Sequence, residues 1–285
     1  MIIVTGGAGF IGTNLVQSLL NINKKVLIVE ELDKYTTKFE NIKNLDILDC
    51  IDHNIFLKNL DNDKYINKIE CIFHLGACSK TTEPDRDYIM DVNLEYSKKL
   101  LMHAANNNID IIYASSASVY GDSNGVEMNP LNYYAISKVQ VDYWVLDNID
   151  RFKSVQGFRY FNVYGDGEEN KGDQASPVSK FTKQIKETGK LKLFEGSDKF
   201  LRDFICVDDI VNIVLDNKKP SGIYDLGTSS PVSFQHVAEC IAKKYNGEIE
   251  YIQFPKHLKG KYQDFTCAMP EWGDYSFMSI EDYLE

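Results

Sequence analysis

The stretch that decides the fold reads Thr5-Gly6-Gly7-Ala8-Gly9-Phe10-Ile11-Gly12. It follows an apolar run at residues 1–5 and opens a segment whose apolar residues have helical spacing. Glycines here permit a tight turn, a close approach of the backbone to a pyrophosphate and close packing of a helix on a strand. The helix N-terminus adds N–H donors and the positive end of the helix dipole. The pattern therefore predicts a dinucleotide-binding turn with glycines at positions 6, 9 and 12.

A second apolar run at residues 26–29 ends at Glu30 and Glu31, about twenty residues beyond the turn. An acidic side chain at this place hydrogen-bonds the ribose hydroxyls of a bound adenosine and repels a 2′-phosphate, which favours NAD. Lys34 and Lys38 follow closely enough in sequence to offset that charge. Both NAD and NADP therefore stay open as the cofactor.

Short apolar runs alternate with longer amphipathic segments over the first 160 residues. The strand-like runs cover residues 1–5, 26–29, 69–74, 109–114 and 154–158. Such alternation is typical of a doubly wound parallel sheet, because parallel strands need crossover helices that cover both faces. Beyond Phe161 the elements shorten: residues 166–174 are typical of a loop, 222–226 of a strand, and a helix is expected to begin after Ser233 as its N-cap.

We therefore expect an α/β fold with two interleaved parts. Residues 1–165 plus about 203–228 would form the dinucleotide-binding part, and about 166–202 plus 229–285 a smaller α/β substrate-binding cap. Ligands of such sheets bind at the carboxyl ends of the strands, where the strand order reverses.

Composition excludes several classes of function. The net charge is −11, from 31 basic and 42 acidic residues, without a lysine- or arginine-rich run, so a nucleic-acid partner is not expected. Six cysteines are scattered and never spaced C-x-x-C, so neither a disulfide framework nor a metal site is expected. We find no apolar stretch near the roughly 20 residues that span a bilayer, and no leader pattern. The expected location is the cytoplasm, without a membrane partner.

A second group of polar residues follows the run at 109–114. Ser116 stands at its end, and Tyr134 and Lys138 come later, four residues apart on one face of an expected helix. A nearby ammonium lowers the pKa of a phenol toward the range of a general base, and a serine hydroxyl can hold the substrate oxygen in line. This combination suits removal of a hydroxyl proton while a hydride leaves the same carbon. We expect the helix to pack on the sheet through the stripe Ala135, Val139, Tyr143 and Leu146.

Through the glycine turn, Ser115-Ser116 and Tyr134-x-x-x-Lys138, the chain resembles the extended short-chain dehydrogenase/reductase family, whose larger part is a Rossmann fold. It is similar above all to the branch that epimerises ADP-linked heptoses at C6″. The stretches behind that similarity are residues 72–79 with 81–83, 157–165, 193–197 with 202–204, and 258–263 with 265–266.

The resemblance implies a redox epimerisation of ADP-D-glycero-D-manno-heptose to the L-glycero form, a step in the supply of lipopolysaccharide core heptose. A nicotinamide cofactor, NADP by resemblance, would oxidise C6″ to a transient ketone and return the hydride to the opposite face. Inversion requires acid/base groups on both faces. The resemblance assigns one to Tyr134, with Lys138 and Ser116, and the other to Lys171 in a loop after Phe161-Asn162-Val163-Tyr164-Gly165. It also implies a homo-oligomer, a pentamer if the chain follows the family.

The same resemblance places further residues at the two ligands. Those at the cofactor, besides the glycines and Lys138, are Phe10, Ile11, Glu30, Glu31, Lys38, Leu75, Gly76, Ala77, Cys78, Ser79 and Val163. Those at the nucleotide sugar, besides Ser116, are Asn162, Asp173, Lys180, Phe194, Glu195, Gly196, Ser197, Arg202 and Tyr262. For Arg202 a physical reason exists as well, because a guanidinium binds diphosphate oxygens in bidentate fashion; the alternative is an ion pair with Asp203.

The chain departs from the family pattern at four places. His53 replaces a lysine after the third strand and Val92 replaces an asparagine, and both weaken the case for NADP. Asp173 replaces a small polar residue near the substrate loop, and the segment after Phe265 is short.

Two other readings compete with this one. A nucleotide-sugar 4-epimerase or 4,6-dehydratase shares the cofactor end, although dehydratases place an acidic pair where this chain has Ala117-Ser118. A nicotinamide-binding module without catalysis does not explain the complete Ser, Tyr and Lys set.

Overall fold

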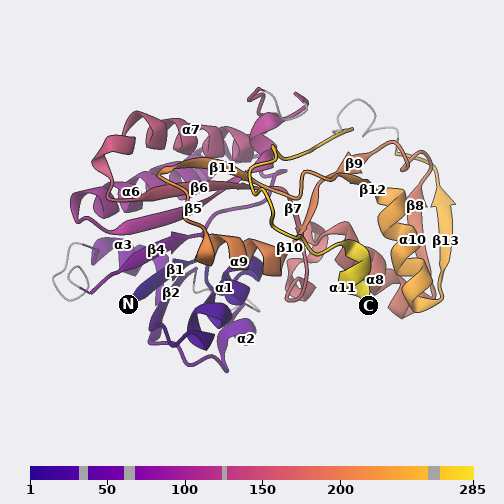
Figure 1. Cartoon of the computed structure of the whole chain (residues 1–285), viewed down its shortest axis with the longest axis horizontal. Coiled ribbons are helices and arrows are strands. Elements are labelled where there is room, and N and C mark those ends of the chain that lie inside the picture. Colours follow the sequence, from indigo (N-terminus) through magenta and orange to yellow (C-terminus); the bar gives the residue numbers. More distant parts are fainter. Residues whose placement is uncertain (32–37, 61–67, 124–126, 256–263) are drawn as a thin grey trace.

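The larger part of the molecule is built on a parallel sheet of seven strands (Figure 1). The structure, a computed structural model, describes residues 1–31, 38–60, 68–123, 127–255 and 264–285. The strand order is β11-β6-β5-β4-β1-β2-β3, so the order reverses between β1 and β4. The strands are β1 (Ile2–Thr5), β2 (Val26–Glu30), β3 (Asp49–Asp52), β4 (Cys71–His74), β5 (Asp110–Ser116), β6 (Val155–Tyr160) and β11 (Gly222–Leu226).

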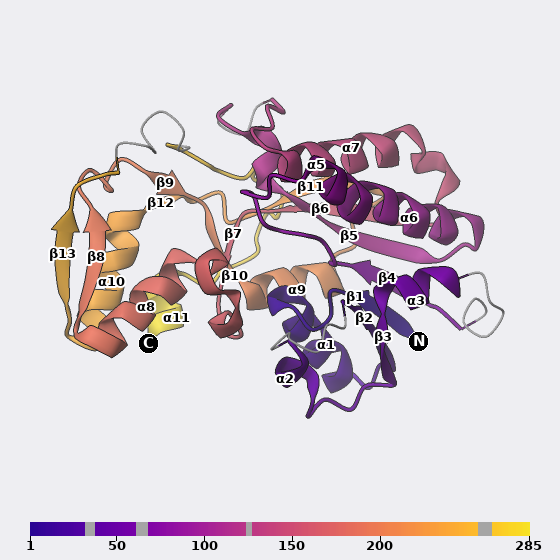
Figure 2. The same ribbon diagram turned by 180° about the vertical axis from the view of Figure 1, so that it is seen from behind.

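Helices cover both faces of this sheet, as Figures 1 and 2 show. Helices α1 (Phe10–Asn21) and α9 (Val207–Asp216) pack on one face in a cluster with β1, β2 and β6. Helices α6 (Tyr96–Asn106) and α7 (Tyr133–Asp147) pack on the other face, with α3 (His53–Lys58). Short elements join them: α2 (Phe39–Ile42), α5 (Arg86–Ile89), a π-helical turn η1 (Met90–Glu95), and the 3₁₀ turns η2 (Ala117–Tyr120), η3 (Ile149–Arg151) and η4 (Glu169–Gln174).

The smaller part has a hydrophobic cluster of its own, to which Ile185, Leu191, Val237 and Ile241 contribute. It lies to the right of the sheet in Figure 1. Its elements are α8 (Pro177–Thr188), the parallel pair β8 (Lys190–Phe194) and β13 (Glu248–Ile252), α10 (Phe234–Tyr245) and α11 (Ile280–Leu284). Short strand pairings join β7 (Asn162–Tyr164) with β10 (Phe204–Cys206), and β9 (Leu201–Arg202) with β12 (Val232–Ser233).

The expected doubly wound sheet is confirmed, and the expected strands lie within two residues of the observed ones. Ser233 caps α10, as expected, by accepting a hydrogen bond from the backbone N–H of His236 at 3.0 Å. The expected packing face of α7 is correct at Ala135, which is buried, and wrong in the second half of the helix. Tyr143 and Leu146 are 52% and 44% exposed, whereas Val141, Asp142 and Val145 are buried. Asp142 lies on the buried side because it has polar partners inside the protein.

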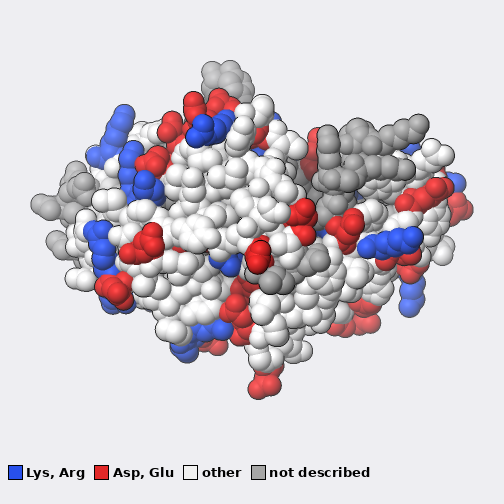
Figure 3. All heavy atoms as spheres, turned by 90° about the horizontal axis from the view of Figure 1, so that it is seen from above, with Lys and Arg blue, Asp and Glu red and all other residues white. Residues whose placement is uncertain are grey.

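On the face shown in Figure 3, acidic and basic side chains of the described residues are interspersed, and they leave wide uncharged areas. That face shows no continuous cationic field among the described residues. None of the helices within the described ranges is long and apolar enough to cross a membrane.

Candidate active site

The glycine turn lies where the strand order reverses, against the segment that follows β4. Gly6 has a φ of +69°, and a Cβ there would lie 2.7 Å from the backbone nitrogen of Gly76. At Gly12 a Cβ would lie 2.1 Å from the carbonyl oxygen of Gly6. Gly9 precedes the first turn of α1 as its N-cap. The turn therefore tolerates only glycine at positions 6 and 12, and the N-terminus of α1 directly follows it, as in sites that bind a pyrophosphate.

A cavity of about 300 Å³ opens beside this turn. Glu30 is buried at the end of β2, where its carboxylate accepts hydrogen bonds from the Ala8 N–H at 3.2 Å and from Lys38 Nζ at 3.0 Å. Lys38 thus offsets the charge of Glu30, while Glu31 is exposed at the rim. The lining includes the predicted cofactor residues Gly6, Glu30, Glu31, Lys38, Gly76, Ala77, Cys78 and Ser79, together with His53 and Val92. The cavity and the glycine turn fit the adenosine and pyrophosphate of a dinucleotide.

The remaining predicted cofactor residues lie next to these two features. Phe10 and Ile11 begin α1, and Leu75 directly follows β4. Val163, in β7, packs with Ile11 and Leu75 against the core cluster on the α1 face of the sheet.

The segment 75–79 is held by a buried network that the sequence analysis missed. Asn93, in the π-helical turn η1, accepts a hydrogen bond from the Cys78 N–H at 2.8 Å and donates to the Cys78 carbonyl at 3.0 Å. Asn93 is fully buried and also donates to Ser137 Oγ on α7, at 3.2 Å. Only the structure reveals this residue: it lies in a π-helical turn, and such turns are frequent at functional sites.

His74 links the same segment to the central strand β1. Its ring nitrogens lie 2.7 Å from Thr5 Oγ1 and 2.8 Å from Ser97 Oγ. The Ser97 hydroxyl donates its hydrogen to the carbonyl of Asn93, so its oxygen can only accept from the imidazole. We therefore assign the imidazole proton to Nε2, and Nδ1 accepts from the Thr5 hydroxyl. Thr5 Oγ1 in turn accepts from the Gly76 N–H at 3.1 Å. Burial, assisted by the charge of Lys138, lowers the pKa of His74 to about 3, so the ring is neutral.

The predicted Ser, Tyr and Lys come together at the end of β5. Ser116 is the last residue of that strand, and Asn132 caps α7 by accepting from the Ala135 N–H at 2.9 Å. Lys138 is buried, with Nζ 5.8 Å from the centre of the Tyr134 ring and 2.7 Å from the carbonyl oxygen of Ala114, to which it donates. Burial lowers the pKa of Lys138 to about 8, against the opposing charge of Asp142.

The pKa of Tyr134 is shifted in the direction opposite to the expected one. Burial raises the pKa of the phenol above its usual value, and a hydrogen bond with Ser116 only partly counteracts this. The ammonium of Lys138 donates its hydrogen bond to the Ala114 carbonyl. The phenol of Tyr134 is therefore neutral.

Behind these residues lies a second buried network. Asp142 of α7 is fully buried and accepts hydrogen bonds from Tyr113 and Ser115 at 3.0 Å and from Arg159 Nε at 2.9 Å. Arg159 also donates to Tyr120 at 2.8 Å. The network ties α7 to β5 and β6, and so fixes the helix that bears Tyr134 and Lys138 relative to the strand that ends in Ser116.

Lys171 lies at the start of α1. Its Nζ is 4.9 Å from the centre of the Phe10 ring and 3.5 Å from the buried carboxylate of Glu168. Burial lowers the pKa of Lys171, and the charge of Glu168 opposes that effect. The same loop reaches the cofactor segment, because Ser79 Oγ donates to Gln174 Oε1 at 3.0 Å. The loop therefore reaches the cofactor cavity through Gln174, while Lys171 lies against Phe10.

An aromatic cavity of about 160 Å³ lies in the smaller part. Three predicted substrate residues, Lys180, Phe194 and Ser197, line it. Arg202 is buried beside it, with its guanidinium carbon 5.6 Å from the centre of the Phe234 ring. The rings that line it are Phe181, Phe194, Phe200, Phe234 and Phe254, of which the sequence analysis named only Phe194.

The other predicted substrate residues surround this cavity or lie apart from it. Glu195 and Gly196 form the turn that follows β8, and Asn162 begins β7. The carbonyl of Asp173 accepts from Lys180 Nζ at 2.6 Å. The Asp203 carboxylate, next to Arg202 in the chain, accepts hydrogen bonds from Thr228, Ser229 and Ala268. Tyr262 and Lys34 lie outside the described residues.

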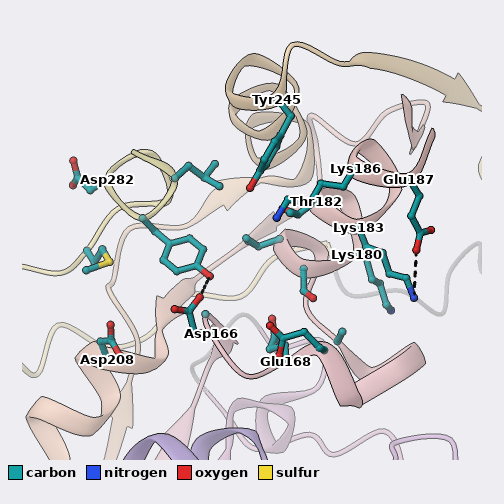
Figure 4. Close-up of a pocket in the computed structure, with 18 of the residues that line it drawn as sticks. Asp166, Glu168, Lys180, Thr182, Lys183, Lys186, Glu187, Asp208, Tyr245 and Asp282 are labelled. Atoms are coloured by element: carbon teal, nitrogen blue, oxygen red, sulfur yellow. Dashed lines mark hydrogen bonds and ion pairs between the residues drawn. The ribbon is translucent and has the colours of Figure 1, made fainter. Parts of the chain in front are cut away.

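A larger cavity, of about 820 Å³, lies between η4, α8, α10 and α11 (Figure 4). Charged side chains of both signs border it, including Lys183 and Glu187 with 3.9 Å between Nζ and Oε1. Tyr283 donates to Asp166 Oδ1 at 2.8 Å at its edge. Its lining contains neither Ser116 nor Tyr134, so it is separate from the group at the end of β5.

Three solved structures resemble the whole chain. The ADP-L-glycero-D-manno-heptose-6-epimerase of Helicobacter pylori is 28% identical, with a TM-score of 0.86 over 99% of this chain and 93% of that chain. The UDP-glucose 4-epimerase of Thermotoga maritima is 22% identical, with a TM-score of 0.79 over 99% and 96%. The UDP-glucose 4-epimerase of Thermus thermophilus, solved with NAD, is 21% identical, with a TM-score of 0.76 over 94% and 90%.

A sequence profile of the NAD dependent epimerase/dehydratase family matches residues 2–227, which include the glycine turn, the Ser, Tyr and Lys group and the whole seven-stranded sheet. This match and the structural likenesses confirm the resemblance to the extended short-chain dehydrogenases/reductases and the expectation of a nicotinamide-dependent enzyme. The chain belongs to the NAD dependent epimerase/dehydratase family.

Proposed function

We propose that the protein epimerises ADP-D-glycero-D-manno-heptose at C6″ to the L-glycero form, through a transient ketone. The proposal rests on one observation above others, the likeness over 99% of the chain to the heptose epimerase of Helicobacter pylori. That likeness extends through the smaller part, where the substrate-binding residues of the proposal lie. Such a reaction would supply the heptose precursor of lipopolysaccharide.

The nicotinamide, when bound, accepts a hydride from C6″ and returns it. We assign the proton of the C6″ hydroxyl to Tyr134, whose ring centre lies 5.8 Å from Lys138 Nζ and whose phenol is hydrogen-bonded with Ser116. We assign proton transfer on the opposite face of C6″ to Lys171. Its buried partner Glu168, 3.5 Å away, can exchange a proton with it. Two groups from different elements, α7 and the 169–174 loop, would thus face the two sides of the ketone.

We place the nucleotide in the aromatic cavity, where phenylalanine rings offer a stacking surface for a base. Arg202 and Lys180 are the cations at its edge that would meet the diphosphate. The dinucleotide part would comprise 1–165 plus about 203–228, and the cap about 166–202 plus 229–285. Six free thiols suit a reducing cytoplasm, and a homo-oligomer is expected as in the family.

For the cofactor we favour NAD over NADP. Glu30 and Glu31 both border the adenosine cavity, while Lys38 neutralises only one of them. Among the described residues no cation is paired with Glu31, so a 2′-phosphate would meet its negative charge. Mass spectrometry of the nicotinamide released from the purified protein tests this: NAD is expected, and NADP would contradict it.

The substrate is tested by incubating the protein with ADP-D-glycero-D-manno-heptose and following the configuration at C6″ by NMR. We expect conversion to a mixture of both epimers. Failure to convert it, together with turnover of UDP-glucose, would instead support the second candidate, a UDP-sugar 4-epimerase, which the fold likeness to two such enzymes favours.

The two bases are tested by Tyr134→Phe and Lys171→Met in the same assay. Each is expected to lower kcat by at least about 100-fold, because each removes a proton-transfer group. Matched controls are Tyr133→Phe, whose ring is 40% exposed, and Lys183→Met, whose side chain is 73% exposed; both should retain activity. An unimpaired Lys171→Met enzyme would remove that residue from the mechanism.

A further inference from the structure

Three metal-binding side chains converge where the last helix meets α10. His236 and Cys240 are four residues apart on α10 and so share one face of it. Glu281 reaches the same point from α11. His236 Nε2 lies 2.7 Å from Glu281 Oε1 and 3.7 Å from Cys240 Sγ, and the three donor atoms all lie within 4.8 Å of one another.

These donor types and distances suit zinc. Zinc is bound by thiolate, imidazole and carboxylate at about 2.0–2.3 Å, so in a tetrahedral site its donors lie about 3.3–3.6 Å apart. The present sulfur–nitrogen distance of 3.7 Å is already close to that. The nitrogen–oxygen distance of 2.7 Å must open by roughly 0.6 Å. A small rotation of Glu281 would achieve this, and its side chain is 51% exposed.

The surroundings leave room for a fourth ligand. His236 and Glu281 line a cavity of about 400 Å³, and their side chains are 40% and 51% exposed. Water can therefore complete the coordination, as in zinc sites with three protein ligands. Because zinc binds the thiolate form of cysteine, binding would release the proton of the Cys240 thiol.

We propose that His236, Cys240 and Glu281 form a binding site for a zinc ion that ties the C-terminal helix α11 to α10. No metal was expected from the sequence, because no two cysteines have C-x-x-C spacing and Glu281 approaches the other two residues only in the folded chain. Helix α11 has five residues, and it packs through Ile280 and Leu284 into the same cluster as α10. A metal bridge would add a cross-link between two elements about 40 residues apart in the chain.

Cobalt(II) is the probe for this site, because a cobalt–thiolate bond gives a charge-transfer absorption in the near-ultraviolet. The full-length protein, stripped with EDTA and dialysed, is titrated with cobalt chloride. We expect the charge-transfer band to saturate at one cobalt per chain and to disappear when zinc chloride is added. Absence of this band in the wild-type protein would overturn the proposal.

Ligand variants locate the site. Cys240→Ser should abolish the band, and His236→Gln should weaken cobalt binding by more than about 100-fold, since even outer-shell partners cost about 10–100-fold. Cys267→Ser is the control, because that free cysteine lies elsewhere in the chain and should leave the band unchanged. Retention of the band in Cys240→Ser, or unchanged cobalt affinity in Glu281→Gln, would overturn the three-ligand site.

Thermal unfolding gives a second test that does not depend on the absorption band. A zinc ion at about 100 times its dissociation constant should raise the Tm of the wild-type protein by about 5 °C, because it binds only the folded chain. The Cys240→Ser protein should lose this rise and the Cys267→Ser protein should retain it. An equal rise in Cys240→Ser would contradict the bridge.

Discussion

Asp142 offers the sharpest test of how the fold fixes the catalytic helix. Asp142→Asn keeps the shape of the side chain but removes its charge. The carboxylate accepts three hydrogen bonds of 2.9–3.0 Å inside the protein, from Tyr113, Ser115 and Arg159. An amide group would turn its NH₂ toward one of these donors. The guanidinium of Arg159 would then retain only Asp225, at 4.0 Å, as an anionic partner among the described residues.

The expected cost follows from these contacts. Breaking one partner of a buried ion pair costs about 3–5 kcal/mol, because the other charge stays buried. Burial raises the pKa of Asp142 in spite of the charge of Arg159. The cost of burying the carboxylate therefore already offsets part of its attraction to Arg159. We therefore expect a loss at the lower end of that range, about 3 kcal/mol of the unfolding free energy. The Tm should fall by about 5 °C.

Urea unfolding of the wild-type and Asp142→Asn proteins measures this loss. Asp147→Asn is the matched control on the same helix, since Asp147 is exposed and its change should stay within about 0.5 kcal/mol. The pH–rate profile adds a second readout. The charge of Asp142 raises the pKa of Lys138, so in the variant the alkaline limb should move to lower pH. A loss below about 1 kcal/mol in Asp142→Asn would refute the reasoning.

Two further predictions concern the network beneath the cofactor segment. The pKa of His74 is about 3 in the folded protein and about 6.5 in the unfolded chain. Between these pH values the unfolded chain binds one more proton than the folded protein. The contribution of His74 to the unfolding free energy is therefore complete above pH 6.5 and should fall by about 2 kcal/mol by pH 5. Urea unfolding at both pH values checks this, and His74→Gln should lack that component; an identical pH dependence in the variant would contradict it. Asn93→Ala leaves the Cys78 N–H and carbonyl unpaired, so the Kd for NAD, measured by calorimetry, should rise about tenfold. Asn106→Ala, an exposed control, should not change it, and an unchanged Kd in Asn93→Ala would show that the segment needs no such support.

The sheet and the glycine turn could be predicted because their signals are local. Apolar runs mark strands wherever both faces are covered, and the spacing of Gly6, Gly9 and Gly12 between a strand and a helix is visible in the sequence alone. The face of α7 could not be predicted in the same way. Lys138 and Asp142 are buried because Ala114 and Ser115 of β5 and Arg159 of β6 provide hydrogen-bond partners. These strands lie outside the sequence of α7, so its pattern does not show them.

For the site, too, local features could be predicted and long-range contacts could not. Ser116, Tyr134 and Lys138 were predicted from spacing at the end of a strand, and the fold brings them together. Asn93 was missed, because its partner Cys78, in the segment after β4, lies 15 residues away in the sequence. The aromatic cavity was missed for a similar reason, since Phe200, Phe234 and Phe254 come from separate segments. The pKa of Tyr134 was predicted in the wrong direction, because burial is not visible in a Tyr-x-x-x-Lys pattern.

The central claim is that the configuration at C6″ is inverted by hydride removal and return inside the protein. It is tested most directly with substrate deuterated at C6″, incubated in ordinary water until both epimers are present. Because the same hydride returns from the bound nicotinamide, the deuterium should be retained at C6″ of the product, as NMR and mass spectrometry would show. Replacement of that deuterium by solvent hydrogen would contradict the account, because it would mean that C6″ is inverted by proton exchange.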